Sequence, residues 1–314
     1  MKRRLIPETN QYKANLHCHS TLSDGKFTPE ELKEGYKKAG YSVLAYSDHN
    51  VLVPHSELKD ETFLPITSTE IDMTEHSDNW LTARTYHFNF FSKDEKRNEF
   101  IPVKRAYDIN VANDMIKRAY AEGFLAMYNH PRWSLQLPDD YVNLDGLSMF
   151  EVYNTGCEKE MINGYGDAEY EIMLRSGKRL FPAATDDNHN GCHDFISPYN
   201  DSFGGFTMLC MDKLDYATAF NTMEKGDIYA STGPVIKEFY IDNNMAHIEC
   251  SPCRTIAVRT ESRATRIIQS NQADLTTVDT DISFNYKWKY IRLEIIDEYG
   301  NRALTRAYLA DETI

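Results

Sequence analysis

The sequence predicts an α/β protein: a sheet or barrel of alternating strands and helices, followed by a small antiparallel β domain. Up to Gly233-Pro234, short apolar runs alternate with amphipathic helical patterns, which is typical of βαβ units and a mostly parallel sheet. After that point the apolar segments are short and alternating, turn signals separate them, and no helical pattern remains. We therefore place one domain at residues 1–234 and a β-sandwich-like accessory domain at residues 235–314.

The elements of the first domain have recognisable boundaries. A brief strand at residues 14–16 leads into a polar segment, and Thr28-Pro29-Glu30-Glu31 then begins a helix with a capping box and Pro in the first turn. Gly40 is a natural stop for that helix. Further strands are predicted at residues 43–46, 63–71, 85–90, 124–127, 147–152, 180–184 and 205–209. Further helices are predicted at residues 111–122, 168–176 and 216–225.

The second domain contains strand-like segments and one histidine. The segments lie at residues 256–259, 266–269, 290–296 and 303–308. Turns such as Asp242-Asn243-Asn244 and Tyr299-Gly300-Asn301 separate them. His247 has no ligand spacing around it, so we expect this domain to carry out no chemistry.

Composition limits the classes of partner and the compartment. The 314 residues carry a formal net charge of −14, which disfavours extended nucleic-acid binding but leaves a small anionic substrate or a short oligonucleotide compatible. Of six cysteines only Cys250 and Cys253 form a CxxC pair, so we expect reduced thiols in a cytoplasmic protein. No apolar run follows the basic first residues, and we expect neither a signal peptide nor a membrane span.

Polar clusters follow the predicted strands. His17 and His19 lie two residues apart, so on an extended strand both imidazoles face the same side. Alone, each residue has an ordinary alternative as a hydrogen-bonded histidine, a turn former, a cap or a solvated carboxylate. Together, six of the ten histidines lie at predicted strand ends, beside carboxylates, in a fold class whose strand ends converge. The candidate ligands are His17, His19, Asp24, His49, Glu70, His87, His130, Asp187 and His189.

This ligand type favours a cluster of divalent ions. Imidazole and carboxylate without thiolate suit Zn²⁺, Mn²⁺ or Fe²⁺. Several carboxylates allow bridging, so we expect two or three ions per chain, which activate water near neutral pH and polarise a phosphoryl or carbonyl oxygen.

The motifs resemble those of the PHP (polymerase and histidinol phosphatase) superfamily over about residues 12–234. The nine candidate ligands match that family in order. The matching motifs are His17-Cys18-His19-Ser20, Ser23-Asp24-Gly25, Pro29-Glu30-Glu31-Leu32, Ser47-Asp48-His49-Asn50, Glu70, His87, Asn129-His130-Pro131 and Asp187-Asn188-His189. A two-domain branch of the superfamily is indicated by residues 146–154, Glu224-Lys225-Gly226, Ser231-Thr232-Gly233-Pro234 and the β domain that follows.

The resemblance implies a distorted (β/α)7 barrel with a trinuclear metal site and a metal-bound hydroxide as nucleophile. It also implies that Asp48 orients an imidazole from outside the ligand set. The implied ligands are His17, His19, Glu70 and Asp187 for the first ion, Asp24, His49 and His189 for the second, and a bridging Glu70 with His87 and His130 for the third.

Two ligand positions have a competitor in the sequence. Asp186 stands where many relatives have Ser, and the DxH spacing favours Asp187. His76 competes with His87, which we prefer because aromatic strand residues flank it.

Residues outside the ligand set are harder to assign. Arg132 is either the cation for an anionic substrate group or a surface arginine, with Arg84 and Lys26 as weaker candidates. His193 is either the acid that protonates the leaving group or a loop histidine.

We expect hydrolysis of a small phosphate ester or a nucleotide-like substrate. The alternatives are hydrolysis of a carboxylic ester or carbamate by the same metals, and a non-catalytic metal-binding regulatory protein.

Overall fold

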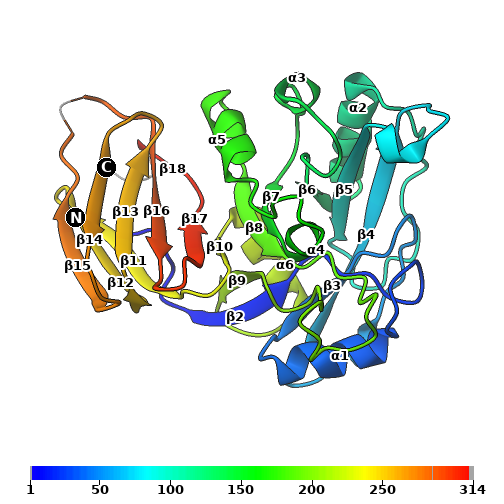
Figure 1. Cartoon of the computed structure of the whole chain (residues 1–314), viewed down its shortest axis with the longest axis horizontal. Helices are drawn as coiled ribbons and strands as arrows, with labels where there is room; N and C mark the ends of the chain where they lie inside the picture. Colours follow the sequence, from blue (N-terminus) through cyan, green and yellow to red (C-terminus); the bar gives the residue numbers. More distant parts are fainter. Residues whose placement is uncertain (1, 285, 311–314) are drawn as a thin grey trace.

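A computed structural model describes residues 2–284 and 286–310. Figure 1 shows two parts side by side: a mixed part of strands and helices, and a part made of strands alone. The chain is therefore a mixed α/β protein with an additional antiparallel sheet, as the sequence predicts. None of the described helices is long and apolar enough to cross a membrane.

The strands of the mixed part form one twisted ladder in the order β10-β9-β2-β3-β4-β5-β6-β7-β8. The pairs β2–β3, β3–β4, β6–β7 and β7–β8 are parallel, and the other four pairs of this ladder are antiparallel. The strands are β2 (Asn10–Asn15), β3 (Val43–Tyr46), β4 (Leu64–Thr74), β5 (Thr85–Ser92), β6 (Phe124–Tyr128), β7 (Met149–Asn154), β8 (Phe181–Thr185), β9 (Phe206–Met211) and β10 (Ile228–Ser231).

The prediction of a mostly parallel sheet is therefore wrong. A parallel pair needs a long crossover, usually a helix, whereas an antiparallel pair needs only a short connection. Between β4 and β5 the chain has only the short 3₁₀ turn Trp80–Thr82, so β5 returns antiparallel to β4. The sequence also predicts no helix between residues 71 and 85, so the inference from the overall alternation overlooked this connection.

Backbone hydrogen bonds do not close this ladder into a ring. Within the described residues, β8 pairs with β7 alone, on one side. On its other side β8 meets β9 through a side chain: Thr207 Oγ1 donates to the carbonyl O of Ala184 (3.0 Å) and accepts from its N–H (3.1 Å). The side chain thus occupies the place that a further ladder bond would take.

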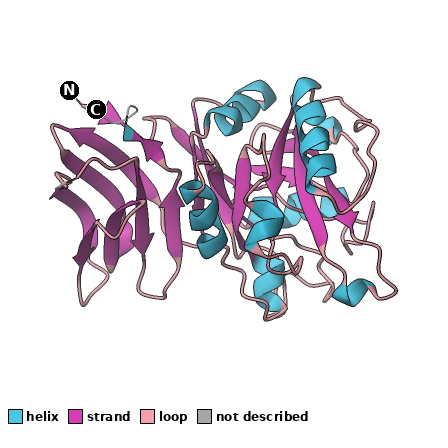
Figure 2. Ribbon diagram, turned by 90° about the horizontal axis from the view of Figure 1, so that it is seen from above, coloured by secondary structure: helices cyan, strands magenta, loops and turns pink. Residues whose placement is uncertain are grey.

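The helices cover the outside of the ladder, as Figure 2 shows. The Thr28 capping box is confirmed, and the chain leaves this helix at Gly40 with a positive φ of 82°. The helices are α1 (Pro29–Lys38), α2 (Ile109–Ala121), α3 (Pro138–Tyr141), α4 (Thr155–Lys159), α5 (Asp167–Arg175) and α6 (Tyr216–Lys225).

The part made of strands contains two antiparallel sheets that share an apolar core. One sheet has the order β1-β11-β12-β15, and the other, β14-β13-β16-β17, continues the ladder of the mixed part through the pair β17–β10. Ile248 and Phe239 of the first sheet and Leu293 of the second belong to one buried cluster. The strands are β1 (Arg3–Arg4), β11 (Ile236–Asp242), β12 (Met245–Cys253), β13 (Thr255–Thr260), β14 (Thr265–Gln269), β15 (Leu275–Asp281), β16 (Tyr290–Ile296), β17 (Arg302–Thr305) and β18 (Tyr308–Leu309).

The boundary between residues 234 and 235 stays a prediction. Two pairings cross it: β1, at the start of the chain, pairs with β11, and β17 pairs with β10. Residues 311–314 of the predicted second domain lie outside the described residues.

A buried ion-pair network also joins the two parts. Arg292 of β16 is 1% exposed and donates from Nη2 to Glu171 Oε2 of α5 at 3.0 Å. Tyr290 donates its hydroxyl to Glu171 Oε1 at 3.1 Å. A charge this deeply buried requires its partners, so the network helps to fix α5 against β16.

Candidate metal centre

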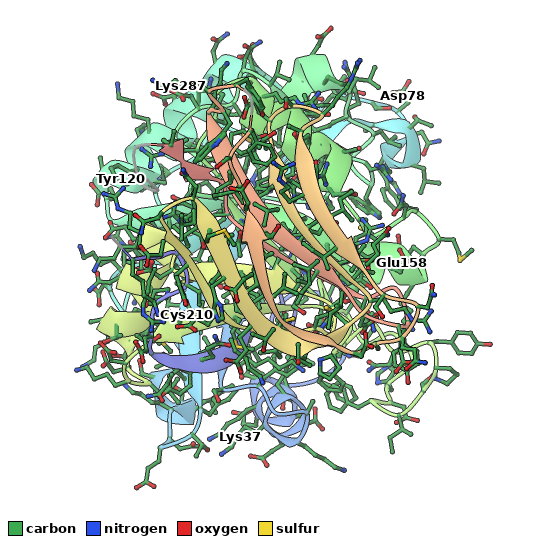
Figure 3. The ribbon with its side chains drawn as sticks, turned by 90° about the vertical axis from the view of Figure 1, so that its left-hand side faces the viewer. Lys37, Asp78, Tyr120, Glu158, Cys210 and Lys287 are labelled. Atoms are coloured by element: carbon green, nitrogen blue, oxygen red, sulfur yellow. The ribbon has the colours of Figure 1, made fainter. Side chains whose placement is uncertain are left out.

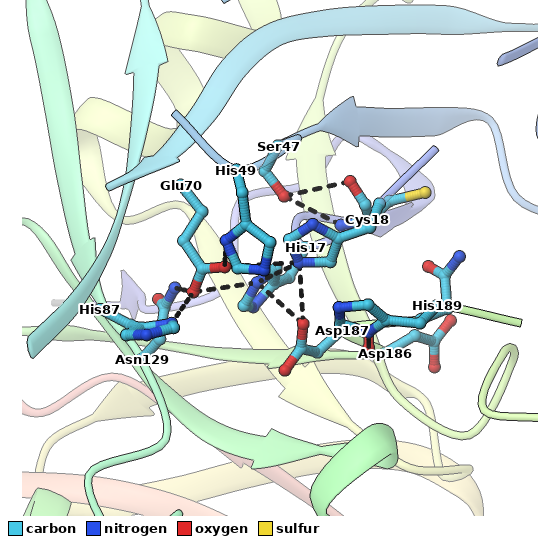
Figure 4. Close-up of polar contacts among 12 residues, drawn as sticks. His17, Cys18, Ser47, His49, Glu70, His87, Asn129, Asp186, Asp187 and His189 are labelled. Carbon is cyan, nitrogen blue, oxygen red and sulfur yellow. Dashed lines mark hydrogen bonds and ion pairs between the residues drawn. The ribbon is translucent and has the colours of Figure 1, made fainter. Parts of the chain in front are cut away.

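The predicted ligands converge at one edge of the ladder. His17 and His19 follow β2, and their two Nε2 atoms lie 3.2 Å apart, each facing Asp187 Oδ1 at 3.1 and 3.0 Å. Two imidazole nitrogens at this separation would repel each other if both carried a proton. The lone pairs of the two Nε2 atoms therefore face a common point, as they would around a cation. Figure 4 shows His17 and Asp187 facing each other across a dashed contact.

Glu70 lies at the middle of the cluster. Its carboxylate is 0% exposed, and Oε1 lies 2.9 Å from His87 Nδ1 and 3.3 Å from both His17 Nε2 and His130 Nε2. Its Oε2 lies 3.1 Å from His49 Nδ1, yet this oxygen accepts no hydrogen bond in the described part of the chain. A fully buried carboxylate oxygen left in this way is costly unless a cation approaches it.

Glu70 and His87 differ from the prediction in their place along the strand. Glu70 lies in the middle of β4 rather than at its end, and His87 is the third residue of β5 rather than a late one. Because β5 runs antiparallel to β4 and β6, its beginning lies at the same edge as the ends of the parallel strands. Strand direction therefore brings His87 into the cluster.

Asp24 reaches the cluster through a tight turn. Its carboxylate lies 3.4 Å from His189 Nε2, 3.7 Å from His49 Nε2 and 3.9 Å from His19 Nδ1. The next residue, Gly25, passes so close to His19 that a Cβ would overlap the carbonyl O of His19. Only glycine permits this approach, which explains the Asp-Gly pair.

All nine predicted ligands belong to four overlapping groups whose ligand atoms lie within 4.8 Å of one another. The groups share members, so neighbouring cations would share ligands. These groups are His17, His19, Glu70 and Asp187; His19, Asp24, His49 and His189; His49, Glu70 and His87; and His17, His130 and Glu151. Their composition, imidazole and carboxylate without thiolate, and their burial fit several divalent ions.

The electrostatics keep the carboxylates ionised. Burial disfavours the charge of Glu70, but His17, His87 and His49 outweigh this and hold the pKa of Glu70 well below its usual value. The pKa of Asp187 is likewise well below its usual value, because His17 and His19 outweigh the effect of burial. Burial and neighbouring imidazoles lower the pKa of His49 to about 4, so its nitrogens are free of the extra proton near neutral pH.

Asp187, and not Asp186, faces the cluster. Asp187 has a positive φ of 51°, which turns its carboxylate toward His17 and His19. Asp186 points the other way and is fully buried, and its oxygens accept the N–H groups of residues 203–205 and the hydroxyls of Tyr36 and Thr155. It anchors the loop before β9.

His76 is exposed in the turn between β4 and β5 and belongs to none of the four groups. His87 is 8% exposed and faces Glu70. The geometry thus agrees with the preference for His87.

Asp48 was expected to orient an imidazole, and this prediction is wrong because its hydrogen-bond partners are serines. Its Oδ1 accepts from Ser20 N–H (2.7 Å) and Ser23 Oγ (2.7 Å), and its Oδ2 accepts from Ser20 Oγ (2.9 Å). These donors occupy the carboxylate, so Asp48 holds the loop that carries Asp24 instead of orienting an imidazole.

Neither of the two predicted substrate-side residues lines the cavity above the cluster. Arg132 donates to Glu169 Oε1 of α5 at 2.8 Å and lines a small neighbouring cavity together with His130 and Glu151. His193 packs edge-on against Phe27 beside Phe195, because a positive φ of 52° turns its ring to that side. The weaker candidate Arg84 is held by Glu75 and Asp140.

Sequence reasoning missed Glu151 and Asn129. Glu151 of β7 accepts from His17 Nδ1 at 2.7 Å, and Asn129 donates to Glu70 Oε1 at 2.9 Å. The signal for Glu151 was available: a lone carboxylate inside an otherwise apolar strand must find buried partners. Asn129 was quoted only as part of a motif, because one amide has no distinctive pattern.

A cavity of about 530 Å³ opens above the cluster. Its rim carries three aromatic side chains, of which Trp80 is 70% and Tyr199 81% exposed. Lys159 is the one lysine or arginine that lines it within the described residues, and its Nζ donates to the carbonyl O of Pro198 at 3.0 Å. The walls thus combine a carboxylate-rich floor, a single cation and an aromatic rim.

Comparisons with known proteins place the chain beside PHP-like proteins. No family model matches it. A stretch of 43 residues, 14% of this chain, is 46% identical to the DNA polymerase/3'-5' exonuclease PolX of Bacillus subtilis and spans 8% of that protein's length. A two-domain protein of Bacteroides vulgatus, described as containing a predicted PHP-like metal-dependent phosphoesterase, is covered over 98% of both chains at 13% identity with a TM-score of 0.47.

Two further solved structures cover about half of the chain. A putative metal-dependent phosphoesterase of Bifidobacterium adolescentis covers 56% of this chain and 87% of its own, at 17% identity and a TM-score of 0.40. An amidohydrolase of Chromobacterium violaceum covers 60% of this chain and 93% of its own, at 12% identity and a TM-score of 0.37. The chain is thus similar, over nearly its whole length, to a two-domain protein described as PHP-like, which is the resemblance that the motifs predict.

Proposed function

We propose that this chain is a PHP-type metal-dependent phosphoesterase that holds two or three divalent ions, with the ladder β2–β10 as its distorted (β/α)7 barrel. The observation that carries the proposal is Glu70, a fully buried carboxylate surrounded by five imidazoles, with one oxygen that accepts no hydrogen bond among the described residues. A bridging position between cations accounts for such a group better than any role in packing, because packing alone leaves its charge unsatisfied.

Two of the three ligand sets implied by the motifs fall within groups of the structure, and the third does so only in part, because His130 groups with His17 and Glu151. His17, His19, Glu70 and Asp187 would hold one ion, and Asp24, His49 and His189 a second. Glu70, His49 and His87 form another group, and His130 lies 3.3 Å from Glu70, so this side of Glu70 would hold a third. When bound, such ions supply Lewis acidity at a phosphoryl oxygen and lower the pKa of a water molecule.

The remaining walls of the cavity suit a small phosphate ester. Lys159 uses one of its three donors on Pro198 and keeps two for phosphate oxygens. Trp133, whose Nε1 donates to Glu160 at 2.9 Å, and the exposed Trp80 and Tyr199 offer flat apolar surfaces for the leaving group. In this arrangement the aromatic rim would orient the leaving group and exclude water behind it.

One observation favours a second candidate, hydrolysis of a carboxylic ester or carbamate. A phosphate group brings negative charge that needs cationic partners. Among the described residues that line the cavity, Lys159 is the one lysine or arginine. A neutral carbonyl substrate needs no such partner.

The experiment is a comparison of substrates on the metal-loaded full chain. p-Nitrophenyl phosphate, bis-p-nitrophenyl phosphate, p-nitrophenyl acetate and a p-nitrophenyl carbamate are tested against the parent, Glu70→Gln and Lys159→Met. The matched control is Lys117→Met, since Lys117 of α2 is exposed and does not line the cavity. We expect phosphoester cleavage that Glu70→Gln abolishes. Lys159→Met should lower kcat/KM about ten- to a hundredfold, as the loss of a charged hydrogen bond predicts. Cleavage of only the neutral esters, with the same kcat/KM in Lys159→Met and Lys117→Met, would replace the proposal by the second candidate.

A further inference from the structure

Two buried thiols lie in contact in the part of the chain that is made of strands alone, the strand part. Cys250 and Cys253, the CxxC pair, are each 0% exposed, and their Sγ atoms lie 3.7 Å apart. Both Sγ atoms also face the backbone carbonyl O of Leu275, at 3.8 and 3.4 Å. Neither cysteine lines the cavity above the metal centre, so this pair is separate from the site described above.

An irregularity of β12 produces the contact between the thiols. Along a regular strand, residues three apart point to opposite faces, so only one of the two cysteines would face the core. Between Glu249 and Cys253, β12 advances four residues while its partner β15 advances only two, from residue 277 to residue 275. The extra residues of this bulge turn Cys253 to the inside, beside Cys250, and leave Pro252 exposed.

The pair lies where the chain passes from one sheet of the strand part to the other. β12 ends at Cys253 in the first sheet, and β13 begins at Thr255 in the second. Figure 3 faces the strand part that contains this crossing. A bond between the two thiols would therefore fix the corner that joins the two sheets.

Packing alone does not account for the bulge. A free buried cysteine behaves as a small apolar side chain, and such side chains need no bulge, since Ala246, Ile248 and Cys250 face the core by ordinary alternation. What the bulge adds is a second thiol against the first. A disulfide holds its sulfurs at about 2.0 Å, so the two Sγ atoms need to approach by only about 1.7 Å to be joined.

The two thiols differ in how readily they ionise. The S–H of Cys250 donates to Cys253 Sγ, the backbone N–H of Thr255 faces the same sulfur, and both lower the pKa of Cys253. The pKa of Cys250 is raised, because its proton is shared with Cys253 and because burial disfavours its charge. Cys253 is therefore the thiol that ionises first.

An oxidant reaches the pair from the edge of a sheet. Within the described strands β15 pairs with β12 alone, and Leu275, which covers both thiols, is the first residue of β15. The end of an edge strand opens at low cost, and this opening uncovers both sulfurs beside the exposed Pro252.

We propose that Cys250 and Cys253 form a reversible disulfide by exchange with a small-molecule disulfide, RSSR, and that this bond locks the corner between the two sheets. The Cys253 thiolate attacks one sulfur of RSSR, which forms a mixed disulfide and releases RS⁻. Cys250 then loses its proton and attacks Cys253 Sγ, which closes the internal bond and releases the second RS⁻. The two protons pass to the two released thiolates, so the protein loses two electrons and two protons and RSSR becomes two RSH.

The test measures this disulfide in the metal-loaded full chain at fixed ratios of reduced to oxidised glutathione. After equilibration the free thiols are alkylated in denaturant, and the mass of the tryptic peptide 238–254 is measured, because it contains Cys250 and Cys253 and no other cysteine. The same measurement on the urea-denatured chain gives the exchange constant that closeness in sequence alone supplies. Cys250→Ser removes one partner, and Cys210→Ser is the matched control, since Cys210 is a buried cysteine of β9 outside the pair and is labelled in Figure 3.

We expect the peptide of the native chain to lose two hydrogens, with an exchange constant at least about tenfold larger than in urea, because the fold already holds the thiols in contact. Cys210→Ser should behave as the parent does, and Cys250→Ser should form no internal bond. An exchange constant equal to or below that of the denatured chain would overturn the proposal. Glutathione on each thiol without the internal bond, or a parent peptide alkylated at both cysteines in every buffer, would also overturn it. Should Cys250→Ser fail to fold, the comparison of the native and denatured parent chains decides by itself.

Discussion

Glu151→Gln tests whether the metal centre depends on a carboxylate outside the implied ligand set. Both oxygens of Glu151 are fully engaged: Oε1 accepts from His17 Nδ1 (2.7 Å) and Thr185 Oγ1 (2.6 Å), and Oε2 accepts from His130 N (3.0 Å) and Asn154 Nδ2 (3.0 Å). With four donors in place, Glu151 has little capacity left for a cation. We therefore expect it to position His17 and His130 and not to be a ligand.

The size of the effect follows from these four bonds. A glutamine amide has one oxygen, so whichever way it is turned its NH₂ group faces two of the four donors. The His17 ring then loses the partner that fixes its tautomer and orientation, or His130 loses its backbone anchor. Loss of such a partner typically lowers metal affinity by about 10- to 100-fold, or ~1.4–2.7 kcal/mol.

The assay is competition between the full chain and a chelator for Mn²⁺ or Zn²⁺, with the number of ions per chain measured in the same samples. Glu160→Gln is the control, because Glu160 lines the cavity above the cluster and bonds only Trp133 among the described contacts. We expect Glu151→Gln to retain every ion with weaker affinity, and Glu160→Gln to match the parent. Unchanged affinity would refute the positioning role, and loss of one whole ion with the others unaffected would make Glu151 a ligand.

Three further predictions concern the strand part and its contact with the ladder. Arg292→Ala should lower the free energy of unfolding by ~3–5 kcal/mol in urea titrations, because Glu171 and Glu294 lose a buried partner. The control Arg118→Ala, which removes an exposed ion pair, should lower it by less than ~1 kcal/mol. Equal losses in the two variants would contradict this prediction. Burial disfavours the charge of Glu171, but Arg292 outweighs it and holds the pKa of Glu171 below its usual value. The stabilisation by the Glu171 carboxylate is thus present above its unfolded pKa near 4.5 and is lost as the pH falls through its lower folded pKa. On acidification the Tm of the parent should therefore fall more than the Tm of Glu171→Gln. Parallel curves of Tm against pH for the two proteins would count against the pair. His247→Ala should keep turnover and metal content within about twofold, since the ion-pair and ring partners of His247 in the described part of the chain are Asp279, Glu238 and Tyr240, all in the strand part. A large fall in turnover would connect the strand part to catalysis.

Much of the architecture is determined locally and could therefore be predicted. The capping box at Thr28 depends on atoms three residues apart, and the same holds for the stop at Gly40. The helix expected at residues 216–225 is α6 (Tyr216–Lys225), because an amphipathic period and its Asp215 cap lie within one segment. The pair His17 and His19 could be predicted as neighbours because alternation along an extended chain places them on one side.

Tertiary structure decided the features that depend on residues far apart in the sequence, namely strand direction and the partners of charged side chains. The direction of β5, which brings His87 to the cluster, is set by which strands accept its backbone groups. Arg132 donates to Glu169, and Asp48 accepts from two serines, so each charged group pairs with a partner from another segment of the folded chain. Hydrogen bonds and periodicity act over a few residues and leave their mark on the sequence. A buried charge, by contrast, takes the nearest complementary group in space, and only the assembled fold determines which group that is.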